Sequence, residues 1–182
     1  MHPALRTRVG LVAFLGFLAC TPLANWMIGH VGTVCVPDGP CLVPVAPSLM
    51  APSGVVTVGV ALVLRDVVQR CLGLVAGLAA ILLGTALSSL VAGPMLVLAS
   101  GTAFALSELT DFAVYTPLQR RHLTAAVLAS SILGLVVDSI VFLSLAFGSL
   151  TFLPGQVVGK LWAVLFAVPL VRWLRHVAPT PA

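Results

Sequence analysis

The chain has 182 residues, of which 60% are hydrophobic and only 8% are charged, and its mean hydropathy is +1.17. No soluble domain of this size has such a composition, so we expect an integral membrane protein. The net charge is +4, but the basic residues occur in pairs along the chain and do not cluster with aromatic residues, which argues against nucleic-acid binding.

A membrane span needs roughly 20 mostly apolar residues. Segments of this kind follow one another at 9–29, 53–71, 73–92, 94–117, 123–147 and 155–174. They predict an all-α integral membrane protein with six transmembrane helices in one bundle, a single domain over 1–182. The first segment could be mistaken for a cleaved signal, but its apolar run continues to Ile28, longer than a signal core. The remaining chain is too short for a soluble catalytic domain.

Basic residues favour the cytoplasmic side of short loops. With the N-terminus inside, four pairs fall on that side: Arg6 and Arg8, Arg65 and Arg70, Arg120 and Arg121, and Arg172 and Arg175. Both termini are then cytoplasmic, in agreement with an even number of helices. We therefore expect a multi-pass protein of the plasma or inner membrane.

The segment 30–52 is the longest stretch between predicted spans, and the same orientation makes it an extracytoplasmic loop. Its density of proline favours extended, turn-rich backbone. Cys35 and Cys41 would then lie in an oxidising compartment, where a disulfide between them can form. The sequence leaves open whether they are bridged or free. With His30 they would supply only three ligands on one flexible loop, and no metal site is predicted.

At the inner end of the second predicted span, Asp66 and Arg70 are four residues apart and share one helix face. They predict an ion pair that either anchors the helix at the interface or takes part in gating. Gly73 permits the tight reversal into the next helix.

The fourth predicted span carries Glu108, Asp111 and Tyr115 on one helix face. A charge at bilayer depth costs about 2.5–3.5 kcal/mol even on the lenient insertion scales. We therefore expect Glu108 to face a polar cavity, whereas Asp111 lies near enough to the cytoplasmic interface for hydration to be the alternative.

Asp138 lies near the middle of the fifth span without a partner in its own helix. It must be neutral, paired across helices, or in contact with water or ligand. Lys160, one turn after Gln156 on the sixth span, either pairs with Asp138 or extends outward to the headgroups. These residues also predict a polar cavity in the bundle.

In their order and spacing these residues resemble the VUT family of small six-helix membrane proteins, the queuosine-precursor transporters, which import 7-deazaguanine bases such as 7-cyano-7-deazaguanine. The resemblance extends from about residue 50 to 170. It is carried by Asp66, Arg70, Gly73, Ala105, Leu106, Glu108, Asp111, Gly134, Asp138, Ser139, Phe142, Lys160 and Pro169. Relatives tend to carry an amide at the position of Glu108 and an asparagine at that of Leu135. Because both positions would face the cavity, these departures bear on the identity of the ligand.

The resemblance implies a transporter and not an enzyme, without cofactor or metal. A guanine-like base offers an N–H and a neighbouring amino group that one carboxylate accepts together, a role for Glu108 or Asp138. Gln156 and Lys160 would donate to the base, and Tyr115, Phe142 or Trp162 would stack on its ring. The expected substrate-binding residues are Glu108, Asp111, Tyr115, Asp138, Phe142, Gln156 and Lys160.

The expected partners are a 7-deazaguanine-type small molecule and membrane lipid, with no nucleic acid, and a homo-oligomer is left open. Import is either coupled to protons through Glu108 or Asp138, or facilitated diffusion followed by trapping. A vitamin-type substrate-binding subunit of an ATP-driven importer is a third alternative. The competing class is a scaffold subunit or a pore-forming protein, but a scaffold gains nothing from buried acidic residues.

Overall fold

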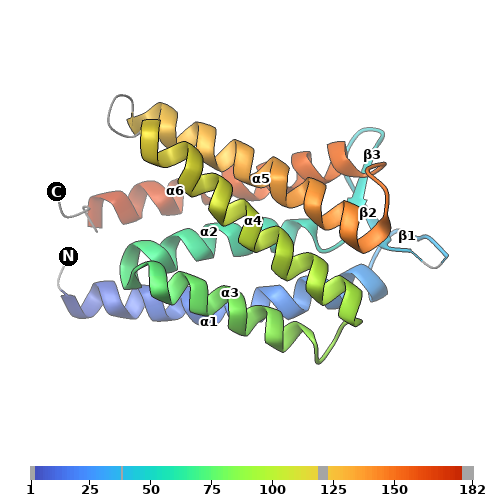
Figure 1. Ribbon diagram of the computed structural model, residues 1–182, viewed down its shortest axis with the longest axis horizontal. Coiled ribbons are helices and arrows are strands. Elements are labelled where there is room, and N and C mark those ends of the chain that lie inside the picture. Colours follow the sequence, from blue (N-terminus) through green and yellow to red (C-terminus); the bar gives the residue numbers. More distant parts are fainter. Residues whose placement is uncertain (1–2, 38, 119–122, 178–182) are drawn as a thin grey trace.

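The computed structural model describes residues 3–37, 39–118 and 123–177 (Figure 1). This part of the chain contains six α-helices: α1 (Pro3–His30), α2 (Val55–Leu72), α3 (Leu74–Ser88), α4 (Pro94–Leu118), α5 (Leu123–Phe147) and α6 (Leu153–Val177). Each of them overlaps one of the six apolar segments, so the predicted succession of helices is confirmed.

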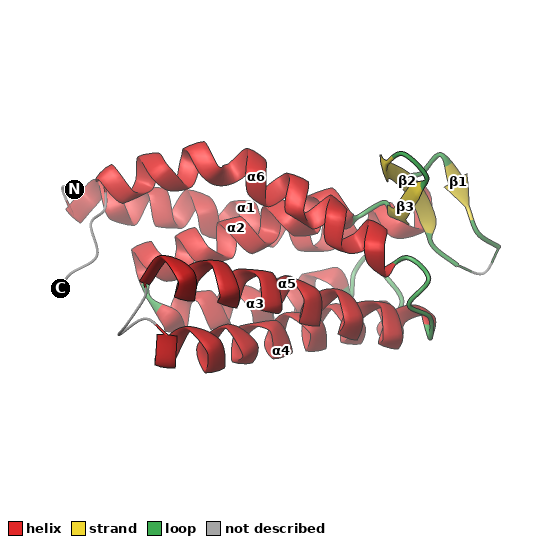
Figure 2. Ribbon diagram, turned by 90° about the horizontal axis from the view of Figure 1, so that it is seen from above, coloured by secondary structure: helices red, strands yellow, loops and turns green. Residues whose placement is uncertain are grey.

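The helices lie side by side in two layers. Figure 2 shows α1, α2 and α6 in one layer and α3, α4 and α5 in the other. The beginning of α1 and the end of α6 lie at the same end of the bundle (Figures 1 and 2), as expected for an even number of antiparallel crossings. We call this the terminal end.

The turn between α2 and α3 follows the expectation for Gly73. This residue has a φ of 95°, a conformation that glycine adopts without steric cost, and its amide donates to the Gln69 carbonyl. By contrast, α3 ends at Ser88, earlier than the predicted span of 73–92. The hydroxyl of Ser89 donates to the carbonyl of Ala86, and Pro94 disfavours helical backbone at the residue before it.

The proline-rich loop folds into a small sheet at the end opposite the terminal end (Figure 1). The strands β1 (Val34–Cys35), β2 (Cys41–Ala46) and β3 (Leu49–Pro52) are antiparallel in that order. Cys35 and Cys41 are directly opposite each other and form a disulfide, which decides between the two alternatives left by the sequence. The all-helical bundle thus carries one small sheet in its longest loop, because the extended backbone there pairs with itself.

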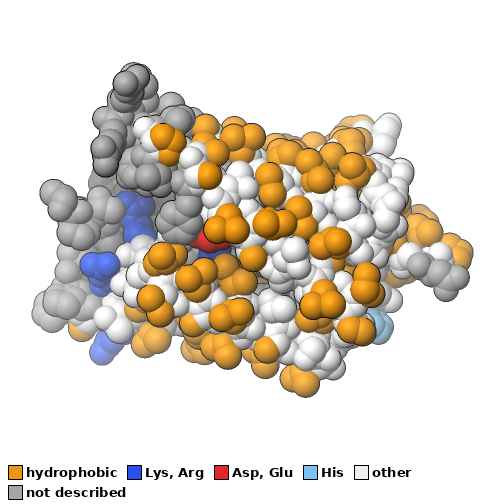
Figure 3. Space-filling model, viewed as in Figure 1, with side chains coloured by type: hydrophobic (Ala, Val, Ile, Leu, Met, Phe, Trp, Pro, Cys, Tyr) orange, Lys and Arg blue, Asp and Glu red, His pale blue; other side chains and the backbone are white. Residues whose placement is uncertain are grey.

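The surface of the bundle is strongly apolar. Val75 and Phe166 are each 80% exposed, and hydrophobic side chains cover much of the face in Figure 3, while Lys and Arg gather towards the terminal end. Inside, however, Arg65, Glu108, Asp138 and Lys160 are at most 5% exposed. This distribution is the reverse of that in water-soluble proteins and favours surroundings of lipid.

Among the described residues, one helix, Ala4–His30, is both long and apolar enough to cross a membrane. The apolar segments Leu74–Ser88, Ser131–Phe147 and Leu153–Phe166 are shorter. The number of spans and the side on which the termini lie therefore stay predictions.

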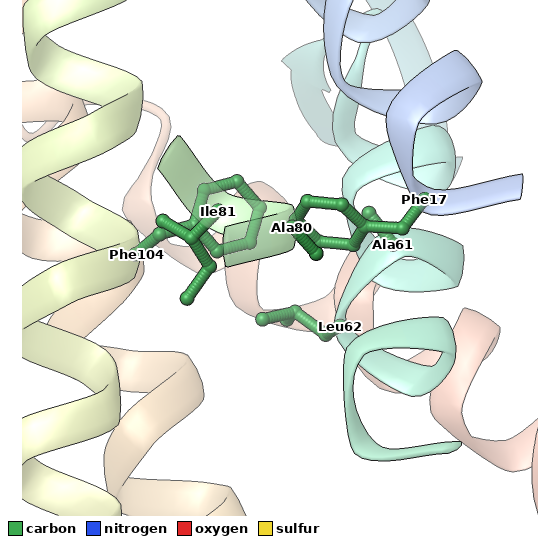
Figure 4. Packing of buried hydrophobic residues seen from close by; sticks show 6 residues of the cluster. All are labelled: Phe17, Ala61, Leu62, Ala80, Ile81 and Phe104. Carbon is green, nitrogen blue, oxygen red and sulfur yellow. The ribbon is translucent and has the colours of Figure 1, made fainter. Parts of the chain in front are cut away.

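An apolar cluster joins the first four helices near the middle of the bundle. Figure 4 shows its six residues, Phe17, Ala61, Leu62, Ala80, Ile81 and Phe104. The rings of Phe17 from α1 and Phe104 from α4 meet edge to face, with centroids 5.7 Å apart. The cluster fixes the position of Phe104, which also borders the site described next.

Candidate functional site

A narrow pocket lies among the helices near the sheet. Its lining comes from α1, β3, the beginning of α2, and α4, α5 and α6: Ile28, Pro52, Gly54, Val55, Val58, Ser100, Ala103, Phe104, Asp138, Phe142, Gln156 and Lys160. The cavity volume is about 20 Å³, room for little more than one water molecule, so the pocket is nearly closed in this conformation. Four of the predicted site residues, Asp138, Phe142, Gln156 and Lys160, are thus brought together.

An ion pair between Lys160 and Asp138 borders the pocket. Lys160 also donates to the hydroxyl of Ser139 at 3.0 Å. Of the two positions expected for Lys160, the structure therefore shows the one directed at Asp138 and not the one directed at the headgroups. Because the two charges neutralise each other, the charged side chains that line the pocket sum to zero.

The rest of the pocket is mainly apolar, with two aromatic rings. Phe104 and Phe142 come from adjacent helices, and Val55 and Val58 from α2 complete the apolar lining. Gln156 is an exception: it is 3% exposed, and its Oε1 has no hydrogen-bond partner among the described residues. A buried carbonyl without a donor is uncommon in native proteins, so Gln156 offers an unused acceptor at this site.

A second charged group lies around Arg65 on α2, and we call Arg65, Asp66, Glu108 and Asp111 the Arg65 cluster. Arg65 Nη2 donates to Asp66 Oδ1 at 2.8 Å and to Asp111 Oδ2 at 2.9 Å. Its Nη1 makes an ion pair with Glu108 Oε2 at 2.5 Å, although the orientation is not that of a hydrogen bond. One guanidinium thus joins three carboxylates and ties α2 to α4.

The Arg65 cluster changes two expectations. Glu108 and Asp111 were expected to bind substrate in the cavity, but they are not among the pocket-lining residues and contact Arg65 instead. Asp66 was expected to pair with Arg70, yet it pairs with Arg65, and the described part of the chain shows no Asp66–Arg70 ion pair. In both cases the partner of the carboxylate is the buried guanidinium of Arg65, which the charge pattern had placed at the cytoplasmic interface.

The Arg65 cluster lies beyond the pocket on the side of the terminal end. Glu108 is eight residues after the pocket-lining Ser100 on α4, about 12 Å along the helix axis. Gly134, one turn before Asp138 on α5, faces this cluster, because a Cβ there would lie 2.5 Å from Asp111 Oδ1. Glu108 therefore has a charged partner within the protein.

Tyr115 and Trp162 were also expected to stack on the ring of the base, and the structure describes the side chain of only one of them. The side chain of Tyr115 lies outside the described residues. Trp162 is half-exposed and donates from Nε1 to the carbonyl of Val45 in the sheet at 3.1 Å, so it is not part of the pocket.

Sequence reasoning missed three polar residues at or near these sites. Arg65 follows Val58 and Leu62 at helical spacing on the buried face of α2, a pattern that could have revealed it. Asn25 on α1 and Ser100 on α4 are buried and hydrogen-bonded to each other. The asparagine could have been singled out, because a polar side chain within an apolar span needs a partner. That its partner is Ser100, 75 residues away, could not be predicted from the sequence.

The chain matches the model of one protein family over residues 90–182, just over half of its length. No curated protein and no solved structure matches it. The matched part contains the pocket-lining residues of α4, α5 and α6, including Asp138 and Lys160, whereas Asp66, Arg70 and Gly73 precede it. The chain belongs to the family described as "Putative vitamin uptake transporter".

Proposed function

We propose that this protein is a multi-pass membrane transporter that imports a neutral 7-deazaguanine-type base, such as the queuosine precursor 7-cyano-7-deazaguanine, through the pocket beside Asp138 and Lys160. The family supports transport of a vitamin-like compound. The resemblance of the site residues to the queuosine-precursor transporters supports the ring system. The observation that carries the proposal is the charge balance of the pocket.

The charge balance of the pocket favours a substrate without a net charge. The carboxylate and the ammonium at the pocket are paired with each other, so neither is free to neutralise an ionised ligand. A vitamin with a carboxylate or a fixed positive charge would have to be buried without a counterion, which is strongly unfavourable. A neutral base avoids this cost.

The remaining lining supports a flat ligand with polar edges. Phe104 and Phe142 can stack on an aromatic ring, an interaction worth about 1–3 kcal/mol per base in single-strand binding proteins. The unused Oε1 of Gln156 accepts a hydrogen bond from a ring N–H or an exocyclic amino group. Because the pocket is narrow, side chains must move apart to admit the base.

We assign gating to the Arg65 cluster, whereas the sequence suggested Asp66 and Arg70 as an ion pair for either anchoring or gating. The apolar cluster around Phe104 and then the Arg65 cluster separate the pocket from the terminal end. With the terminal end in the cytoplasm, the described conformation is closed towards the inside. Release of the base then requires α2 and α4 to separate at Arg65.

The test is uptake of 7-cyano-7-deazaguanine by cells that can neither synthesise nor import it, measured as queuosine in their transfer RNA. The wild type should restore queuosine. Gln156→Met should lower initial uptake by up to about tenfold, since it removes one hydrogen bond to the base. Its folding stability should be unchanged or higher, because the replaced carbonyl has no hydrogen-bond partner among the described residues.

Thr85→Val is the matched control. The hydroxyl of Thr85 is also buried without a partner among the described residues, but it is not at the pocket. Uptake by this variant should equal that of the wild type. Absence of queuosine with well-expressed wild type would refute the proposed substrate, and equal uptake by Gln156→Met and wild type would refute the position of the site.

A further inference from the structure

A second pair of polar side chains lies beside the pocket, on helices other than those of the ion pair. Ser100 Oγ on α4 donates to Asn25 Oδ1 on α1 at 2.9 Å. The two residues are 7% and 4% exposed, and Asn25 Nδ2 has no hydrogen-bond partner among the described residues. A buried amide nitrogen without an acceptor is uncommon and calls for an explanation.

The position of the pair connects it to the ligand site. Ser100 lines the pocket, as does Phe104 one turn further along α4. On α1, Ile28 lines the pocket three residues after Asn25, a spacing that places both on one helix face. Asn25 is not itself a lining residue, but its hydrogen bond to Ser100 places its amide directly behind the wall of the pocket.

The hydrogen bond within the pair decides what each group can offer to a ligand. The hydroxyl proton of Ser100 is used towards Asn25, so Ser100 Oγ can only accept a further hydrogen bond. The amide nitrogen of Asn25 retains its donors. An acceptor thus lies beside a donor, which is complementary to an N–H group beside a carbonyl.

We propose that Asn25 and Ser100 bind the lactam edge of the transported heterocycle, with Ser100 Oγ accepting from the ring N–H and Asn25 Nδ2 donating to the ring carbonyl. This inference rests on the proposed function and extends it to a choice among neutral bases. Bases with a lactam edge are selected, and bases that carry an amino or alkoxy group in its place are rejected. The amino-substituted edge is left for Gln156 on α6.

The experiment uses the whole chain in liposomes. It measures how strongly unlabelled bases compete with labelled 7-cyano-7-deazaguanine for binding. One competitor, 7-deazahypoxanthine, keeps the lactam edge but lacks the exocyclic amino group. The other, O6-methyl-7-deazaguanine, keeps the amino group but has neither the N–H nor the carbonyl of the lactam edge. The wild type should bind the methylated competitor about 10- to 100-fold more weakly than 7-deazaguanine, which serves as the reference competitor, because the polar groups of the site stay unpaired with the methylated base.

Asn25→Leu should reduce this discrimination to about threefold or less, since one side of the lactam contact is gone. Discrimination against 7-deazahypoxanthine should stay as in the wild type. Ser100→Ala should act in the same direction and provides the test if Asn25→Leu does not fold. Thr21→Val is the control, because the buried Thr21 hydroxyl, one turn before Asn25, donates to the Phe17 carbonyl and not towards the pocket.

The outcomes separate the two proposals. If the wild type transports no 7-cyano-7-deazaguanine, the proposed function fails and this inference falls with it. If the wild type transports the base and both variants keep the full discrimination against the methylated competitor, the lactam assignment alone is wrong. An equal loss of affinity for all competitors would also overturn it, because that result indicates a structural role.

Discussion

Removal of one member of the Asp138–Lys160 ion pair should destabilise the protein far more than replacement of both. Both residues are almost completely buried, and the only other hydrogen bond of the Lys160 ammonium within the described residues goes to Ser139. In Asp138→Asn the ammonium therefore keeps a single neutral partner. In Lys160→Met the carboxylate loses its cation.

The expected size follows from this burial. Breaking a buried ion pair by removing one partner costs about 3–5 kcal/mol, whereas replacing the whole pair is often nearly neutral. Each single variant should lose about 3–5 kcal/mol of unfolding free energy, and Asp138→Asn/Lys160→Met should come within about 2 kcal/mol of the wild type. The effects of the single substitutions are then strongly non-additive.

The measurement is a double-mutant cycle of unfolding free energies in mixed detergent micelles. Hydrogen bonds between helices in a membrane bundle average only about 0.6 kcal/mol. Costs of that size for both single variants, or additive effects in the double variant, would refute a buried pair of full charges.

Three other changes test the remainder of the structure. Arg65→Gln should lower stability by about 3–5 kcal/mol, because three carboxylates lose their shared cation; thermal unfolding reports this. Gly134→Val should displace Asp111 from Arg65 and lower both stability and uptake, because the new side chain needs the space of the carboxylate. Replacement of Cys35 and Cys41 by serine should cost about 2 kcal/mol, the chain-entropy value for so short a loop, measured by unfolding under non-reducing conditions.

Each of these changes has a matched control in the same chain. Arg70→Gln removes an arginine of α2 that has no ion pair in the described part of the chain. Gly93→Ala adds a methyl group where nothing lies within 4 Å, and Cys20→Ser replaces an unbridged cysteine. Controls that lose as much stability as their test variants would contradict the contacts assigned to Arg65, Gly134 and the disulfide.

Much of the helical framework could be predicted from the sequence. Segments of about 20 apolar residues can satisfy their backbone hydrogen bonds only as helices when they lie in lipid. The reversal at Gly73 was predictable because few other residues tolerate its positive φ. The sheet was less predictable, since proline indicates extended backbone but not which strands pair.

The candidate site was predictable in its residues and less so in its partners. Asp138 and Lys160 stood out because a charge in an apolar span needs compensation. The same argument correctly singled out Glu108 and Asp111 as buried or half-buried, but it directed them to the ligand. The structure gives them Arg65, a residue that the charge pattern had placed at the cytoplasmic interface.

The sequence by itself thus determined the membrane class, the succession of six helices and the residues whose charges require a partner. Only the tertiary structure decided that Lys160 pairs with Asp138, that Arg65 joins three carboxylates, and that Asn25 meets Ser100. The physical reason is that the helical repeat tells on which face of a helix a residue lies. Which other helix that face meets depends on packing between segments far apart in the chain.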